Sequence, residues 1–296
     1  MKREDFLKTL SLLPLTAHSM NIADFNSFTA DLKPTQRMPV LFVGHGSPMN
    51  AIETNGFTKT WEELGKRLPT PKAVLVISAH WLTRGTQVTA MEFPKKINDF
   101  GGFPRALSES TYPAKGNPTL ASEIKEIITS TNVGLDHDWG LDHGAWSVLK
   151  KMYPDANIPI LQLSIDFYKP ASYHYDLAKQ LSDLRDRGVL ILGSGNMVHN
   201  LRMAAFDRMD EANYGFDWAK EANGLFKKYI LDGNHQALFD YQKLGEAVQL
   251  SVPTPDHYYP LIYSLALQNK KDNISFFNDQ LQAGSLSMTS VLIEAN

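Results

Sequence analysis

The sequence predicts an α/β fold, a three-layer sandwich with a mostly parallel central sheet flanked by helices. Two observations predict it. Four short runs are almost entirely apolar and rich in Val, Ile and Leu, which is the pattern of parallel strands buried on both faces. Segments with apolar residues at helical spacing lie between these runs, so the chain alternates strand and helix. No internal repeat or clear boundary interrupts the alternation, which favours one domain.

The apolar runs mark the expected strands. They lie in PVLFVGHGSP, AVLVISAHW, IPILQLSID and GVLILGSGNMVHN, which cover residues 39–48, 73–81, 158–166 and 188–200. The first and the last continue into Gly-rich turn sequence, which indicates where each strand ends. Residues 274–293 alternate more weakly, and we expect antiparallel edge strands there.

Apolar spacing also marks the expected helices. In the first of them the side chains of Trp61, Leu64 and Leu68 share one face. The full set covers residues 57–68, 118–129, 144–152, 173–187, 218–231, 236–244 and 260–268. We expect a single folded domain over residues 38–296, preceded by an N-terminal extension over residues 1–37.

The composition excludes several classes of function. The 296 residues are 43 % hydrophobic and 21 % charged, ordinary values for a globular protein, and carry a net charge of −3. No long basic run is present, so we expect neither nucleic acid nor an anionic membrane surface as a partner. No apolar segment is long enough to span a bilayer, so no stable membrane insertion is expected. Because cysteine is absent, any metal must be held by His, Asp or Glu.

The first 17 residues, MKREDFLKTLSLLPLTA, have a charged start and a modestly apolar stretch. They resemble the start of twin-arginine export signals, with Arg3, Phe6, Leu7 and Lys8 in place. Glu4 stands where the second arginine belongs, so the defining feature is missing. We therefore interpret the segment as an extension and expect a cytoplasmic protein, with periplasmic export as the alternative if the segment acts as a signal.

Histidines fall at the expected carboxyl ends of three strands. His45 follows VLFVG, His80 follows AVLVISA, and His199 follows VLILGSGNMV, while His257 lies in the loop TPDHYYP. Open α/β sheets bind ligands at this edge, so we expect the four side chains to meet there. A lone histidine at such a place is usually structural, but four in this arrangement indicate a site. Neutral imidazole binds Zn, Fe, Cu and Ni, and three protein ligands with open positions are typical of a catalytic metal.

Glycines surround two of these histidines. Gly44 and Gly46 flank His45, and the run Gly193, Ser194, Gly195 precedes Asn196 and His199. We interpret the second run as a loop that passes close to a ligand, with a plain tight turn as the alternative. The string GSGNMV lacks the third glycine of a dinucleotide fingerprint, so a nucleotide cofactor is not expected.

Five motifs carry a family resemblance. In order, GHGSPMNAI, VISAHW, GLDHGAWSVL, GSGNMVHNLR and PTPDHYYPLIY resemble the 4,5-DOPA extradiol dioxygenase-like family, within the class III extradiol ring-cleaving dioxygenases. The resemblance extends from Pro39 through the rest of the chain. It implies an α/β fold with one metal at the edge of the sheet.

The resemblance also implies residue roles. His45, His80 and His257 would hold the metal, and His199 would be the acid/base residue, close enough to serve as a fourth ligand in the substrate-free state. His143, in GLDHG, would be catalytic by hydrogen-bonding the substrate or oxygen. Family members use Fe(II) for activity and also hold Zn(II) as isolated. Broader relatives have Glu at the place of His257; Asp256 ranks second as the third ligand.

The hypothesis for function follows from these roles. A DOPA-like catechol and O2 would be the substrates of an extradiol ring-cleaving dioxygenase, with His199 moving protons at a pKa near neutral pH. Two alternatives stay open: a zinc hydrolase that uses a metal-bound hydroxide, and a non-catalytic metal- or ligand-binding protein of the same fold. The sequence leaves the catechol, the position of cleavage and the oligomeric state open.

Further residues near the motifs have two readings each. Asp142 and Asp256 would either orient neighbouring imidazoles or belong to turns. Four aromatic residues would either wall the pocket for a planar substrate or pack in the core; they are Trp81, Phe103, Trp146 and Tyr258.

Overall fold

The structure is a computed structural model that describes residues 37–296. The expected extension and its export-signal motif therefore lie outside the described residues, apart from Arg37. The centre of the described part is a six-stranded sheet with the order β6-β2-β8-β1-β12-β9. The strands are β1 (Val40–Gly44), β2 (Ala73–Ser78), β6 (Ile160–Gln162), β8 (Val189–Gly195), β9 (Asn273–Phe277) and β12 (Ser290–Glu294).

The direction of the strands matches the expectation. The neighbours β6, β2, β8 and β1 are parallel, while β12 runs antiparallel to β1 and β9 runs antiparallel to β12. The apolar runs thus form the buried parallel part of the sheet, and the weakly alternating segment forms its antiparallel side. This confirms the predicted α/β class with a mostly parallel sheet.

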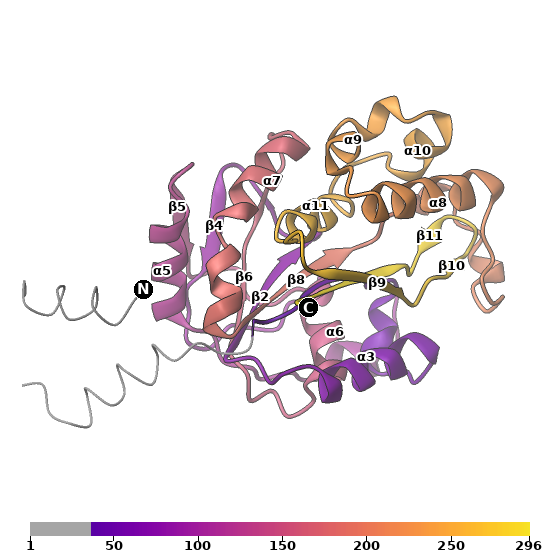
Figure 1. The fold of residues 1–296 in the computed structure, drawn as a ribbon. Helices are drawn as coiled ribbons and strands as arrows, with labels where there is room; N and C mark the ends of the chain where they lie inside the picture. Colours follow the sequence, from indigo (N-terminus) through magenta and orange to yellow (C-terminus); the bar gives the residue numbers. More distant parts are fainter. Residues whose placement is uncertain (1–36) are drawn as a thin grey trace, which may run out of the picture. The chain divides into compact units, whose positions relative to one another are not determined.

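Helices cover both faces of this sheet, so the fold has three layers (Figure 1). Successive side chains of a strand point to opposite faces. Phe42 accordingly packs into one buried cluster and Leu41 into another. The helices α3 (Gly56–Arg67) and α6 (His143–Met152) pack in the cluster of Leu41, and α7 (Ala171–Lys179) and α11 (Tyr259–Leu265) pack in the cluster of Phe42.

Asp142 sets the start of α6. Its carboxylate accepts a hydrogen bond from the backbone N–H of Ala145 at 3.2 Å, which satisfies one of the unpaired donors of the first turn. The same carboxylate is fully buried and accepts bonds from Ser78 on β2 and Gln162 on β6. The first residue of α6, His143, is thereby fixed against the edge of the sheet.

Several elements differ from the sequence-based expectation. The predicted helix 173–187 is split into α7 and a 3₁₀ helix, η2 (Ser182–Arg187), and both parts bury their leucines. The predicted helix 236–244 is likewise split into α9 (His235–Phe239) and η5 (Tyr241–Lys243). The parallel pair β4 (Thr86–Thr89) and β5 (Val133–Asp136) was not predicted, because TQVT and VGLD are short and half polar.

The remaining elements complete the described chain. They are η1 (Pro48–Ala51), β3 (Leu82–Thr83), α4 (Arg105–Glu109), α5 (Pro118–Ile127), β7 (Ile165–Asp166), η3 (Leu201–Met203), η4 (Phe206–Arg208), α8 (Asp217–Leu231), α10 (Glu246–Ser251), β10 (Leu281–Gln282) and β11 (Leu286–Ser287). Within residues 37–296, none of these helices combines the length and the apolar content that a membrane crossing requires.

Candidate active site

Four histidines meet at the carboxyl edge of the parallel strands, as the sequence predicts. His45 directly follows β1, His80 follows β2, and His199 follows β8, while His257 lies just before α11. One ring nitrogen from each of His45, His80 and His257 lies within 4.8 Å of the other two. The ring of His199 stacks on that of His257 with 3.5 Å between centroids. Strands β2, β8 and β1 are neighbours, which is why the loops after them converge.

A fifth histidine joins the cluster from α6. The ring centroid of His143 lies 4.0 Å from that of His80 and 5.3 Å from that of His45. His143 is 6 % exposed, so it is nearly enclosed by the protein. All five histidines singled out in the sequence are therefore in one place.

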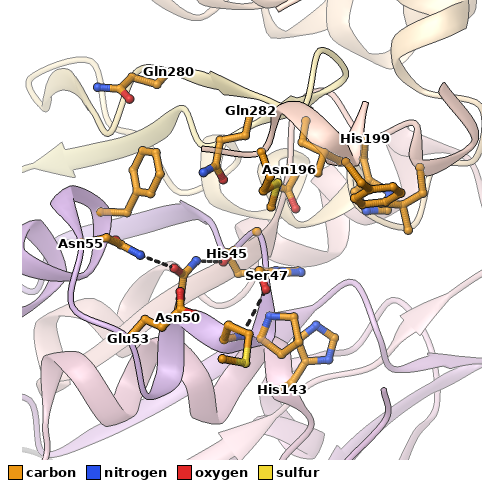
Figure 2. A pocket seen from close by; sticks show the side chains of 18 of the residues that line it. His45, Ser47, Asn50, Glu53, Asn55, His143, Asn196, His199, Gln280 and Gln282 are labelled. Atoms are coloured by element: carbon orange, nitrogen blue, oxygen red, sulfur yellow. Dashed lines mark hydrogen bonds between the residues drawn. The ribbon is translucent and has the colours of Figure 1, made fainter. Parts of the chain in front are cut away.

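The histidines open onto a cavity of about 840 Å³. Figure 2 shows His143 on one wall, with Asn196 and His199 across from it. The apolar part of the lining is Pro48, Met49, Phe57, Phe100, Phe103, Leu201, Phe206, Met209, Ala212 and Leu286. Of the four aromatic residues considered for a wall, Phe103 alone lines this cavity; the other three are buried, with Trp81 stacked on Trp139.

Hydrogen bonds assign the proton of His45. The hydroxyl of Ser194 donates to the carbonyl of Gly144 at 2.6 Å. The Ser194 oxygen therefore accepts the bond that links it to Nδ1 of His45 at 3.0 Å. With the proton on Nδ1, the lone pair of His45 is on Nε2, which faces Nε2 of His80 at 3.1 Å.

A hydrogen bond also assigns the proton of His257. Its Nδ1 donates to the carboxylate of Asp256 at 2.5 Å, which leaves the lone pair on Nε2. Burial opposes ionisation of Asp256, but its bonds with His257 outweigh this and hold the pKa of Asp256 far below its usual range. Asp256 thus contacts an imidazole, which agrees with the interpretation that it orients a neighbouring histidine.

Burial keeps most of the cluster neutral. It lowers the pKa of His45 and of His80 well below the ordinary value, and the neighbouring histidines lower both further. Burial and then His257 lower the pKa of His199 to about 2. The expectation of a pKa near neutral pH for His199 is therefore not met in this structure, where the ring is a neutral base.

This arrangement fits a divalent metal. Nε2 of His45 and Nε2 of His80 lie 3.1 Å apart. Two nitrogens bound to one ion at about 2.1 Å are roughly 3.0–3.4 Å apart, so this spacing suits a shared cation. Three imidazole nitrogens form a donor set that both Fe(II) and Zn(II) use.

Asp99 is a site residue that the sequence reasoning missed. One of its oxygens accepts from Nδ1 of His143 at 2.9 Å, and the other accepts from the backbone N–H of His143 at 2.9 Å. The first oxygen also lies 3.4 Å from Nδ1 of His80. Asp99 lies in a loop with no apolar period, so nothing in a single sequence marks it. Asp142, by contrast, caps α6 and bonds Ser78 and Gln162, and among the described residues it has no hydrogen bond to a histidine ring.

The glycines before His199 were interpreted as a loop close to a ligand, and for Gly195 this interpretation is wrong. Gly195 is the last residue of β8, and a Cβ there would overlap the backbone carbonyl of His257. It therefore makes room for the loop that carries His257, and not for a ligand. Gly46, with a φ of +59°, is the position where the turn after His45 requires left-handed backbone.

Comparison with known proteins places these features in context. Residues 38–274 match the family model described as "Catalytic LigB subunit of aromatic ring-opening dioxygenase". A protein of Escherichia coli K12 named "4,5-DOPA dioxygenase extradiol" is 48 % identical over 261 residues, which are 87 % of this chain and 95 % of the relative. A protein of Beta vulgaris with the same name is 33 % identical and covers 84 % of this chain and 94 % of its own length.

A solved structure agrees with the fold. The crystal structure of an uncharacterized protein from Escherichia coli K12 matches with a TM-score of 0.74 and 42 % identity. The match covers 87 % of this chain and 100 % of the solved chain. All five histidines lie within residues 38–274, the range that matches the family model.

Proposed function

The chain belongs to the family of the catalytic LigB subunit of aromatic ring-opening dioxygenases, and we propose that it opens a DOPA-like catechol beside its diol with O2, at a mononuclear non-haem metal. Both atoms of O2 enter the product. We assign the catalytic unit to residues 38–296. The observation that carries the proposal is the convergence of His45, His80 and His257 at the wall of an 840 Å³ cavity.

His45, His80 and His257 would hold the metal. One ring nitrogen of each lies within 4.8 Å of the other two, and three protein ligands leave positions for small molecules. Fe(II), when bound, supplies the one-electron chemistry that lets a singlet catechol react with triplet O2. We therefore propose Fe(II) as the active metal, with Zn(II) able to occupy the same nitrogens.

His199 is the proposed base. Its ring lines the cavity beside His257 and has no hydrogen-bonded carboxylate among the described residues, so its nitrogen is placed to take a proton from a catechol hydroxyl and later return it. Its position on the ring of His257 holds it beside the metal ligands. This position also suits a fourth ligand in the substrate-free state.

His143 is the proposed hydrogen-bonding group on the other wall. With its Nδ1 turned to Asp99, its Nε2 is left for a hydroxyl or oxygen in the cavity. Phe100 lies edge-on to His143 with 5.7 Å between centroids, and Phe103 lies beside Phe100. These rings provide an apolar wall for a planar substrate and exclude water from it.

The test is reconstitution with Fe(II) under anaerobic conditions, followed by oxygen uptake and absorbance with DOPA and simple catechols. Stoichiometric uptake and a yellow ring-opened product are expected. The same protein loaded with Zn(II) should consume no oxygen. No uptake with any catechol, despite bound iron, would contradict the proposal.

A further inference from the structure

We propose that Asp99 is a positioning residue that fixes the tautomer and orientation of His143 and joins it to the aromatic wall. The catalytic consequence of this role rests on the proposed function. The role itself is a property of the folded protein and can be tested without turnover.

Asp99 holds His143 at two points. Its two oxygens accept from the ring Nδ1 and from the backbone N–H of the same residue, each at 2.9 Å. Two bonds from one carboxylate fix the rotation of the ring relative to its own backbone. The Asp99 side chain is only 16 % exposed, so solvent competes weakly for these bonds.

Helix capping alone does not explain these contacts. α6 already has Asp142 as its cap, bonded to the backbone N–H of Ala145. A second carboxylate at the same helix end is not required for the fold, and it brings a negative charge into a nearly buried place. A capping role would not explain the hydrogen bond between Asp99 and the ring of His143.

The chemistry of the pair fixes the tautomer. An ionised carboxylate can only accept, so Nδ1 of His143 must carry a proton. In the Nδ1–H tautomer, Nε2 is the acceptor that remains for the cavity that His143 lines. In this state His143 can accept a bond from a catechol hydroxyl, which the other tautomer could not do.

Asp99 also anchors the aromatic wall. Phe100 follows it directly, and the Phe100 ring lies edge-on to His143 with 5.7 Å between centroids. On the other side, the indole of Trp146 on α6 donates to the carbonyl of Ile97 at 2.9 Å. The loop is therefore attached to α6 at two points, Ile97 and Asp99, just before Phe100.

Asp99→Asn is the test, because it keeps the shape of the side chain. The amide oxygen can still accept from the backbone N–H of His143, which turns the amide N–H₂ toward the ring. Nδ1 must then become the acceptor and Nε2 must carry the proton. We expect ¹⁵N-histidine NMR of the zinc-loaded protein, without substrate, to show His143 changing from the Nδ1–H to the Nε2–H form. Asp138→Asn, at an exposed carboxylate near the start of α6, is the matched control and should change nothing.

A double-mutant cycle tests the consequence for turnover. With Fe(II), Asp99→Asn should lower kcat roughly 10–100-fold, the range for carboxylates that orient a histidine. In a His143→Ala background the same change should lower kcat less than about 3-fold, since nothing is left to position. Metal content should stay equal to that of the wild type.

Three outcomes would overturn the proposal. They are an unchanged tautomer, an equal effect of Asp99→Asn in both backgrounds, and loss of metal in Asp99→Asn, which would mean that Asp99 acts through His80. If the wild type turns over no catechol at all, the proposed function fails, while the NMR result still decides the role of Asp99.

Discussion

The imidazole of His199 lies flat on the imidazole of His257, with 3.5 Å between centroids and 7° between planes. The backbone N–H of His199 donates to the carbonyl of Ser251 at 2.8 Å, which holds the loop that carries the ring. Two contacts thus place a neutral base against a residue that we propose as a metal ligand. The separation of these functions, binding by His257 and proton transfer by His199, leads to the first prediction.

Replacing His199 should stop turnover and spare metal binding. His199→Phe keeps a flat ring on His257 and removes both nitrogens, so we expect oxygen uptake to fall about 10²–10⁴-fold, the usual effect of losing a general base. The Fe(II) content after reconstitution should match the wild type. Loss of iron in His199→Phe would show that His199 is an obligatory ligand.

Replacing any of His45, His80 or His257 with Ala should remove the metal itself. We expect affinity for Zn(II), measured by titration calorimetry, to fall by more than the 10–100-fold that loss of an outer partner typically causes. His137→Ala is the control, because His137 is exposed and outside the cluster. Retention of wild-type affinity in any of the three variants would exclude that histidine from the ligand set.

Adding one methyl group at Gly195 should displace the loop that carries His257. A Cβ there overlaps the carbonyl of His257, so that loop must move. We expect Gly195→Ala to lose about 1–3 kcal/mol of stability, as overpacking does, and to bind Zn(II) more weakly. Gly224→Ala is the matched control, because Gly224 lies in α8 with nothing within 4 Å of the added carbon. Alanine should be neutral or slightly stabilising there.

His174 should make stability depend on pH. It is fully buried against Tyr263, and burial lowers its pKa to about 4. In the unfolded chain the pKa is about 6.5, so between these values the unfolded state binds the proton and the folded state does not. Stability should therefore fall as the pH drops from about 6.5 to about 4, by up to roughly 3 kcal/mol.

His174→Gln tests this contribution. Glutamine can still bond Tyr263 but does not titrate, so denaturation curves at pH 7 and pH 5 should differ less for this variant than for the wild type. An identical pH dependence in the two proteins would show that His174 does not contribute.

The sequence was enough to predict the strands and the place where the chemistry collects. Carboxyl ends of neighbouring parallel strands must share an edge, so His45, His80 and His199 could be brought together from strand ends alone. His257 does not follow a strand, and its role as a metal ligand was implied only by the family resemblance. The stacking of His199 on His257, and its effect on the pKa, required coordinates.

What the sequence could not predict depends on contacts between distant loops. Asp99 meets His143 across 44 residues of chain, and no periodicity records such a pair. Gly195 resembled a ligand-binding turn, because the neighbour that needs the space, His257, lies far along the chain. The strands β4 and β5 were not predicted because each is short and half polar, and their pairing with each other cannot be seen in the sequence.

The route of the chain to the histidine cluster also bears on how the protein matures. His45 and His80 follow strands that leave the ribosome early, whereas His257 arrives only with the turn into α11, after β8 has been made. A nascent chain that ends at β8 therefore offers two of the three imidazoles. Because two imidazoles chelate an ion less strongly than three, the proposed metal would be loaded late, after the parallel sheet has folded.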